Sequence, residues 1–273
     1  MRIRLVLARS LVRIGKVVES LALMVLRPED LLDLGRSTYG TEASIKYWSS
    51  DQFVGQGLSA AEAELVQALP AHRGRLLVLG VGGGREAIPL AQAGFEVTGV
   101  DYVPGMVQSA IENASRSALA MKGLVQDVGD LDVPAGTFDV VWFSPAMYSC
   151  VPTRKKRVDL LHKVRTALKP EGMAVCQFAY DFGRRTSGAG ELARRALAVL
   201  SLGNLAYETG DVLWGNQEFL HVFSSEVALR SEWQEGGFDA IDIRAPSGAT
   251  RGAAMLRPAG SVGKPDQGKG LVA

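Results

Sequence analysis

A strand, a glycine-rich turn, a helix and a second strand follow one another near the middle of the chain, and this order constrains the fold most. Arg75–Leu79 is a short apolar run, and four of the five residues in Gly80–Gly84 are glycine. Arg85–Ala93 is typical of a helix, and Phe95–Val100 is typical of a strand that leads to Asp101. A helical crossover makes two such strands parallel. The sequence therefore predicts an α/β fold with a parallel sheet.

The glycine turn and the acid suit a ligand that contains adenosine. Gly82 and Gly84 have no side chains, so a ligand can approach their backbone closely. Asp101 follows Gly80 by 21 positions, at the end of the neighbouring strand, where a carboxylate can accept both hydroxyls of a ribose. A dinucleotide fingerprint would need a glycine at Arg85. The spacing G-x-G-x-G therefore favours a nucleoside without phosphates.

Several segments, in order, resemble the motifs of the class I S-adenosylmethionine-dependent methyltransferases. The resemblance runs from about Tyr39 to Arg257, which is most of the chain. Several motifs in the right order are more specific than any one of them. The segments that carry the resemblance are Leu76–Arg85, Val100–Tyr102, Val125–Val128, Phe138–Phe143 and Leu168–Val175.

This resemblance implies a Rossmann-like, doubly wound, mostly parallel seven-stranded sheet with helices on both faces. The methyltransferase domain is expected over residues 36–258, with a helical substrate-cap insertion over residues 183–220. Phe238–Ile243 and Ala253–Leu256 would supply the last two strands. Residues 1–35 are expected to form a helical extension. Residues 259–273 are Gly-rich and are expected to be a disordered tail.

The resemblance also implies S-adenosylmethionine as the cofactor. Asp127 would meet the adenine amino group, and Met106 would cover the adenine. Many members carry an acid where Val78 stands here, so backbone carbonyls or Glu86 would have to hold the methionyl ammonium; Glu86 could instead complement a helix dipole. The expected cofactor-binding residues are Gly80, Val81, Gly82, Gly84, Asp101, Tyr102, Met106, Asp127, Val128 and Ser144.

Three residues are candidates for the catalytic base. Methyl transfer is an in-line displacement, in which the protein mainly positions the nucleophile, and a hydroxyl or carbon acid also needs a base. His221 is the first candidate because the chain returns there to the cap before the last helix, although packing in its aromatic run is the alternative. Tyr148 and Asp181 are the others, since they follow the fourth and fifth strands.

Two other segments have a structural alternative beside a functional one. Tyr39, Tyr47 and Trp48 resemble an aromatic segment that closes over the cofactor in many members, and ordinary packing is the alternative. Lys155–Arg157 is a short basic run at a helix start, for which we predict a solvated face. Cys150 is predicted to be a buried thiol.

Charge and cysteine content limit the partners. Lys and Arg number 30 and Asp and Glu 29, so a nucleic-acid partner is not expected and a small-molecule acceptor is favoured, at oxygen, nitrogen or carbon. The two cysteines have no metal spacing, which predicts no metal site and suits the cytoplasm. Two other functions stay open here: a nicotinamide-dependent oxidoreductase, and a non-catalytic binding module at a membrane surface.

The first 27 residues are predicted to form a basic amphipathic helix. Five basic residues and a single acid, Glu19, lie between positions 2 and 25. At about 100° per residue, Arg2, Arg9, Arg13 and Lys16 fall opposite an apolar stripe. The helix could pack on the domain as a brace or lid, lie peripherally on an anionic membrane, or serve in targeting. The stripe consists of Ile3, Leu7, Leu11, Ile14, Val18, Leu21 and Val25.

Overall fold

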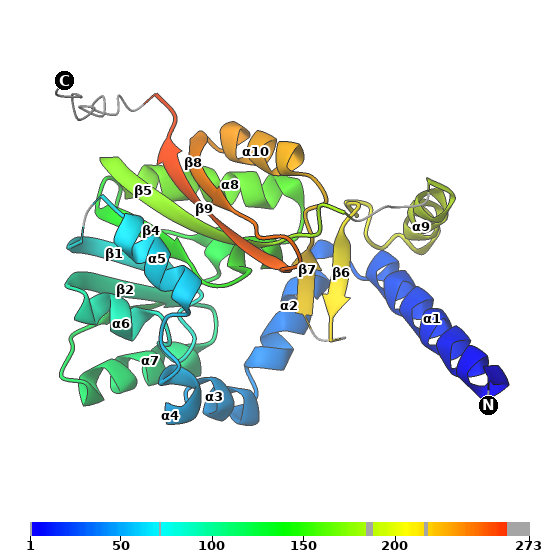
Figure 1. Cartoon of the computed structure of the whole chain (residues 1–273), viewed down its shortest axis with the longest axis horizontal. Helices are drawn as coiled ribbons and strands as arrows, with labels where there is room; N and C mark the ends of the chain where they lie inside the picture. The colour runs from blue at the N-terminus through cyan, green and yellow to red at the C-terminus, as the bar shows by residue number, and fades with distance from the viewer. Residues whose placement is uncertain (1, 71, 184–187, 216–217, 261–273) are drawn as a thin grey trace, which may run out of the picture.

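Seven strands form one sheet. In a computed structural model, residues 2–70, 72–183, 188–215 and 218–260 of the chain are described. The strands are β1 (Gly74–Leu79), β2 (Phe95–Asp101), β3 (Lys122–Val125), β4 (Phe138–Phe143), β5 (Leu168–Ala179), β8 (Phe238–Arg244) and β9 (Arg251–Pro258). Their order is β3-β2-β1-β4-β5-β9-β8, and only β9 runs antiparallel to its neighbours (Figure 1). The predicted Rossmann-like, mostly parallel sheet is confirmed.

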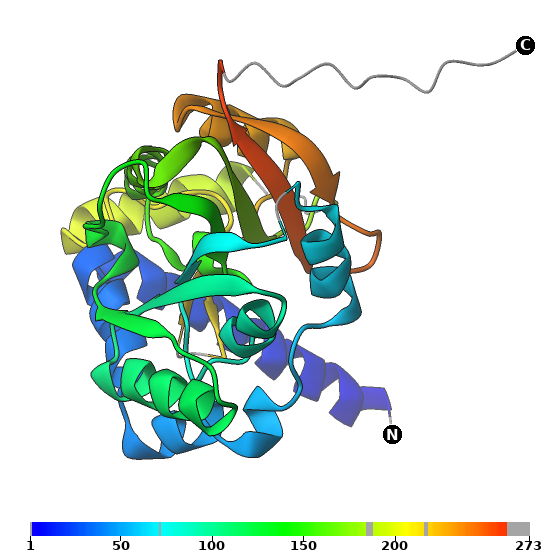
Figure 2. The same cartoon turned by 90° about the vertical axis from the view of Figure 1, so that its left-hand side faces the viewer.

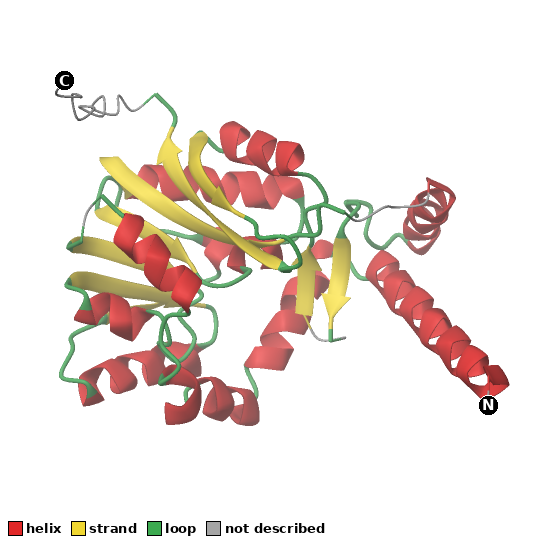
Figure 3. Cartoon of the chain, in the orientation of Figure 1, coloured by secondary structure: helices red, strands yellow, loops and turns green. Residues whose placement is uncertain are grey.

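Helices cover both faces of the sheet (Figures 1 and 3). Side chains alternate along β1, so Leu76 and Val78 pack with one set of helices, and Leu77 and Leu79 pack with the other. Both faces of a parallel strand are therefore apolar here, as a buried strand requires. The first set is α5 (Ala60–Ala68), α6 (Ala87–Gln92) and α7 (Pro104–Arg116), and the second is α8 (Arg154–Ala167) and α10 (Glu226–Glu235).

A smaller apolar cluster lies beside the sheet and joins the N-terminal helices to the segment between β5 and α10. It contains Leu23, Met24, Leu31, Ala198, Leu213 and Phe219. These residues come from α1 (Arg2–Val25), α2 (Pro28–Tyr39), α9 (Gly188–Ser201) and the antiparallel hairpin of β6 (Asp211–Trp214) and β7 (Glu218–His221). The cluster fixes α2 next to the sheet domain.

Two short helices connect α2 to the sheet domain. They are α3 (Glu42–Trp48) and α4 (Asp51–Val54), and α3 lies against α7 (Figure 2). Side-chain caps start both helices: Thr41 accepts from the Ser44 N–H, and Ser50 accepts from the Phe53 N–H. No helix in the described part of the chain is long and apolar enough to cross a bilayer. Of the predicted tail over residues 259–273, all but the first two residues lie outside the described ranges.

Candidate functional site

A cavity of about 1330 Å³ opens at the carboxyl ends of β1, β2 and β4. Parallel α/β sheets bind ligands at this edge, because the crevice between adjacent crossovers lies there. Nine of the ten residues predicted to bind the cofactor line the cavity; Gly84 does not. The nine are Gly80, Val81, Gly82, Asp101, Tyr102, Met106, Asp127, Val128 and Ser144.

The glycine turn has two distinct sides. Gly82 has a φ of +50° and nothing within 4 Å of the position that a Cβ would take, so its backbone faces open space. Met147 covers Gly80. Gly84 packs toward Ala110 of α7 and thus supports the turn, which corrects the prediction that a ligand approaches it. Sequence reasoning missed Gly83, which lines the cavity and leaves no room for a side chain.

Position 83 must be a glycine because the backbone at Trp48 and Ser49 lies directly against it. A Cβ there would clash with the Trp48 carbonyl and the Ser49 Cα. Tyr39 and Trp48 line the cavity, whereas Tyr47 is exposed. Trp48 packs edge-on against Phe53, with ring centroids 4.5 Å apart. The aromatic segment therefore rests directly on the glycine turn and forms one wall of the cavity.

Two carboxylates mark the ends of β2 and β3. The Asp101 oxygens accept the Gly82 and Val103 N–H groups, each at 3.0 Å. Burial raises the pKa of Asp101, and these backbone N–H groups oppose that effect. Asp127 accepts from the Gly129 N–H at 2.8 Å, and from the Arg36 guanidinium of α2 at 3.0 Å. Both acids are thus held rigidly at the cavity wall.

Val78 and Glu86 have opposite environments. Val78 is fully buried in the apolar cluster between the sheet and α5–α7, so it faces no ligand. Glu86 lines the cavity, and burial raises its pKa to about 7, although the positive charge of Arg85 lowers it. Arg85 bridges Glu86 and Glu62, at 2.8 Å from each. Glu86 is therefore a buried carboxyl that lines the cavity, whereas Val78 does not reach it.

A second polar group also lines the cavity, next to Tyr39. Glu218 of β7 accepts the Cys150 thiol at 3.3 Å and forms a hydrogen bond with Tyr39. Burial raises the pKa of Tyr39, and Glu218 adds to this effect, so the phenol stays protonated. Cys150, predicted to be buried, is half-buried and lines the cavity. Sequence reasoning missed Glu218 because it depends on how the β6–β7 hairpin folds back.

The predicted cap contributes to the cavity only in part. Within residues 183–220, Glu218 and Leu220 line it. Helix α9 contacts α1 and lies away from the sheet edge (Figure 1).

None of the three predicted catalytic side chains lines the cavity, and each has another partner. His221 is buried, and its Nδ1 lies 2.8 Å from Asp211. Tyr148 is fully buried and donates to Glu232 at 2.8 Å. Asp181 is exposed and accepts from the Gly183 N–H at 3.2 Å. These placements favour structural roles, which corrects the interpretation of all three as candidate bases.

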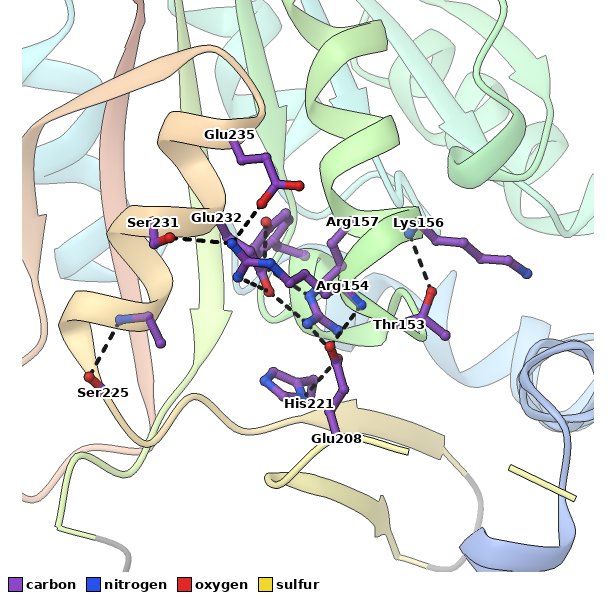
Figure 4. A network of polar contacts seen from close by, with 12 residues as sticks. Thr153, Arg154, Lys156, Arg157, Glu208, His221, Ser225, Ser231, Glu232 and Glu235 are labelled. Carbon is purple, nitrogen blue, oxygen red and sulfur yellow. Dashed lines mark hydrogen bonds and ion pairs between the residues drawn. The ribbon is translucent and has the colours of Figure 1, made fainter. Parts of the chain in front are cut away.

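A buried ion-pair network explains two of these placements (Figure 4). Arg157 is 0% exposed, contrary to the predicted solvated face. Its guanidinium pairs with both oxygens of Glu232, at 3.0 and 2.8 Å, and with Glu208 at 2.6 Å. His221 lies 3.7 Å from Glu208 on the other side. Two carboxylates around one arginine satisfy the buried charges and join α8, α10 and the β6–β7 hairpin.

The same network contains a set of potential metal ligands. Glu208, Asp211 and His221 have ligand atoms within 4.8 Å of one another, the one such group among the described residues. The Glu208 carboxylate already pairs with the Arg157 guanidinium, and the Asp211 carboxylate already contacts the His221 ring. A cation next to this guanidinium would meet strong repulsion. The arrangement favours a structural network over a metal centre.

Known proteins are similar to this chain in the segment that forms this sheet edge. A sequence model described as a methyltransferase domain matches residues 76–172. The YqeM protein of Bacillus subtilis (strain 168), named as a methyltransferase candidate, is 32% identical over 108 residues. The match covers 40% of this chain and 43% of YqeM, so the chain spans less than half of the length of this curated relative.

Solved structures share the fold. The CcbJ methyltransferase from Streptomyces caelestis has a TM-score of 0.57 at 19% identity, over 81% of this chain and 98% of that one. The 1,6-didemethyltoxoflavin-N1-methyltransferase of Burkholderia thailandensis, solved with 1,6-didemethyltoxoflavin and S-adenosylhomocysteine, has a TM-score of 0.59 at 16% identity, over 85% and 90%. The matched segment contains the glycine turn and Asp101, and these comparisons go against the nicotinamide alternative.

Proposed function

We propose that this chain is a class I S-adenosylmethionine-dependent methyltransferase, which transfers a methyl group from S-adenosylmethionine to a small-molecule acceptor. The observation that carries the proposal is the open backbone at Gly82 beside the Asp101 carboxylate, on the wall of a cavity of about 1330 Å³. When bound, the cofactor supplies a sulfonium-activated methyl group. The residues of this chain need only bind, orient and exclude water.

The cavity wall fits the nucleoside half of this cofactor. Asp101 is oriented by two backbone N–H groups, which leaves further lone pairs for ribose hydroxyls. Met106 and Val128 supply buried apolar contacts, and Asp127 supplies a polar one. A Cβ at Gly82 would enter the open space next to Asp101. Two apolar side chains and two carboxylates suit a nucleoside without phosphates, because the carboxylates would repel a phosphate group.

Glu86 is the proposed partner of the methionyl ammonium. It is a buried carboxyl on the cavity wall, next to Ser144 at the end of β4. A cation brought close to a buried carboxylate favours its ionised form. Glu86 thus replaces the acid that many family members carry where Val78 stands.

Glu218 is the proposed base for the acceptor. Its carboxylate lies on the cavity wall, where Tyr39 and Cys150 hold it by hydrogen bonds. An acceptor with an O–H or N–H group can donate to the free lone pairs of Glu218 and transfer its proton there as the nucleophile attacks. The hydroxyl of Tyr39 and the carboxylate of Glu218 would orient the acceptor from the same wall. This assignment takes the place of His221, Tyr148 and Asp181.

Calorimetry with S-adenosylhomocysteine tests the cofactor site. Asp101→Ala should weaken binding about tenfold or more, because a charge-assisted hydrogen bond contributes about 1.5–3 kcal/mol. Asp239→Ala is the matched control, since Asp239 is exposed on β8, at the far edge of the sheet. Unchanged binding in Asp101→Ala, or no heat with wild type at millimolar ligand, would refute the proposal.

Mass spectrometry of a metabolite extract incubated with methyl-labelled cofactor identifies the acceptor. Glu218→Gln should then lower kcat about 100-fold or more with unchanged S-adenosylhomocysteine binding, because only proton removal is lost. Labelled protein or nucleic acid in place of a small molecule would overturn the acceptor class. A Glu218→Gln variant with wild-type kcat would remove Glu218 as the base.

A further inference from the structure

Helix α1 leaves its apolar stripe uncovered. The side chains of Ile3 and Leu11 are 77% and 68% exposed, and Val18 and Val25 are also exposed. Figure 1 shows α1 projecting from the sheet domain, with the N-terminus at its far end. The described side chains of the stripe are therefore largely exposed to solvent.

The last turn of α1 fixes the orientation of the helix. Leu23 and Met24 are buried in the cluster with α9 and the β6–β7 hairpin. The Met24 carbonyl accepts from the Asn204 N–H at 2.8 Å, and a Cβ at Gly203 would clash with this carbonyl. At about 100° per residue, Leu23 lies on the side of the helix opposite the stripe. The anchoring contact therefore turns the stripe away from the protein.

The charge of α1 indicates what covers the stripe. Five of the six charged residues of this helix are basic, in a chain whose formal net charge is only +1. Arg2, Arg9, Arg13 and Lys16 follow the face opposite the stripe. An apolar stripe with basic residues on the other face is the pattern of helices that lie in the headgroup region of an anionic bilayer.

A second helix next to α1 also exposes apolar side chains. Helix α9 contacts α1, and its Leu192 and Leu200 are exposed, as is Leu205 in the loop that follows. Large apolar side chains gathered on adjacent elements mark an interaction surface. This surface lies away from the cavity, beyond the α1 anchor.

We propose that α1 binds an anionic lipid surface, with the stripe in the boundary between headgroups and acyl chains and the basic side chains reaching the lipid phosphates. The apolar contact and the electrostatic attraction act together. The protein should therefore not bind neutral vesicles, and it should bind anionic vesicles weakly once the stripe is disrupted. The enzyme then works as a peripheral protein with its sheet domain in water. This proposal does not depend on the cofactor or the acceptor.

Vesicle flotation with two neighbouring substitutions tests it. Leu11 and Val12 are both exposed, at 68% and 61%, but only Leu11 belongs to the stripe. Leu11→Glu and Val12→Glu change the net charge equally. With vesicles of phosphatidylglycerol and phosphatidylcholine, Leu11→Glu should reduce binding about tenfold or more, and Val12→Glu less than about threefold. Wild type should not float with phosphatidylcholine alone.

Three outcomes would overturn the proposal. These are no binding of wild type to the anionic vesicles, equal losses in the two variants, and full binding of Leu11→Glu. Light scattering after gel filtration gives a fourth: a wild-type dimer that Leu11→Glu dissociates would show that a second copy covers the stripe. Because both side chains are exposed, both variants should keep the wild-type midpoint of thermal unfolding.

Discussion

The buried carboxyl of Glu86 should make the stability of the ligand-free protein depend on pH. Its pKa is raised from 4.5 to about 7 by burial. Between these values the folded protein keeps a proton that the unfolded chain releases, so stability falls as pH rises through this range and is constant above it. A difference of about 2.5 in pKa corresponds to about 3 kcal/mol, at about 1.4 kcal/mol per pH unit.

Glu86→Gln removes this titration while keeping the size of the side chain. Urea unfolding between pH 5 and pH 8 should show that wild type loses about 2.5 kcal/mol more stability than Glu86→Gln, because the unfolded chain is already mostly ionised at pH 5. The glutamine of the variant does not titrate, so the pH dependence of its stability comes from the other groups, and the difference between the two slopes isolates the titration of Glu86. Glu171→Gln is the control, since Glu171 is exposed on β5. Equal slopes for wild type and Glu86→Gln would refute the reasoning.

The same titration should appear in binding. If the ionised Glu86 holds the ligand ammonium, S-adenosylhomocysteine should bind wild type more tightly as pH rises from 6 to about 7.5, and then level off. Glu86→Gln should bind more weakly and without this dependence. A variant that keeps the wild-type pH profile would place the ammonium elsewhere, while the stability result above could still hold.

Three further substitutions test the structure. Arg157→Met should lower the free energy of unfolding by about 3–5 kcal/mol in urea titrations, because the buried Glu232 carboxylate loses both of its hydrogen bonds from the Arg157 guanidinium; a loss below about 1 kcal/mol would contradict this. Gly83→Ala should push the Trp48 backbone outward and weaken S-adenosylhomocysteine binding about tenfold or more by calorimetry, and wild-type affinity would show that the wall is free to move. Leu23→Ala should abolish amide-exchange protection at the end of α1, since it loses about 2 kcal/mol or more of packing; unchanged protection would mean that α1 is anchored elsewhere.

The local order of the chain was enough to predict the sheet and the cofactor side of the cavity. Gly80 and Asp101 are joined by a single crossover, so their spacing fixes where both lie once the strands pair. Asp127 and Ser144 follow the next parallel strands and reach the same edge for the same reason. Periodicity could not tell which glycine faces the cavity, because that depends on Trp48 and Ala110, which lie far away in the sequence.

The acceptor side depends on contacts between distant segments, and sequence reasoning failed there. Arg157 looked like part of a solvated basic run, but Glu208 and Glu232, 51 and 75 positions away, draw it into the interior. His221 and Tyr148 lie beside the same two acids, inside this buried network and away from the cavity. Glu218 was missed because nothing in its local sequence shows that β7 faces Tyr39.

Helix α2 joins two parts of the molecule that have different tasks. Leu31, near its start, belongs to the apolar cluster that anchors α1, and Arg36, one turn further along, grips Asp127 at the nucleoside wall. Tyr39 ends the helix beside Glu218. A shift of α2 that moved Arg36 away from Asp127 would also move the start of α2, which packs with the end of the 24-residue helix α1. A partner that holds α1 in place would therefore also hold Arg36 at this wall.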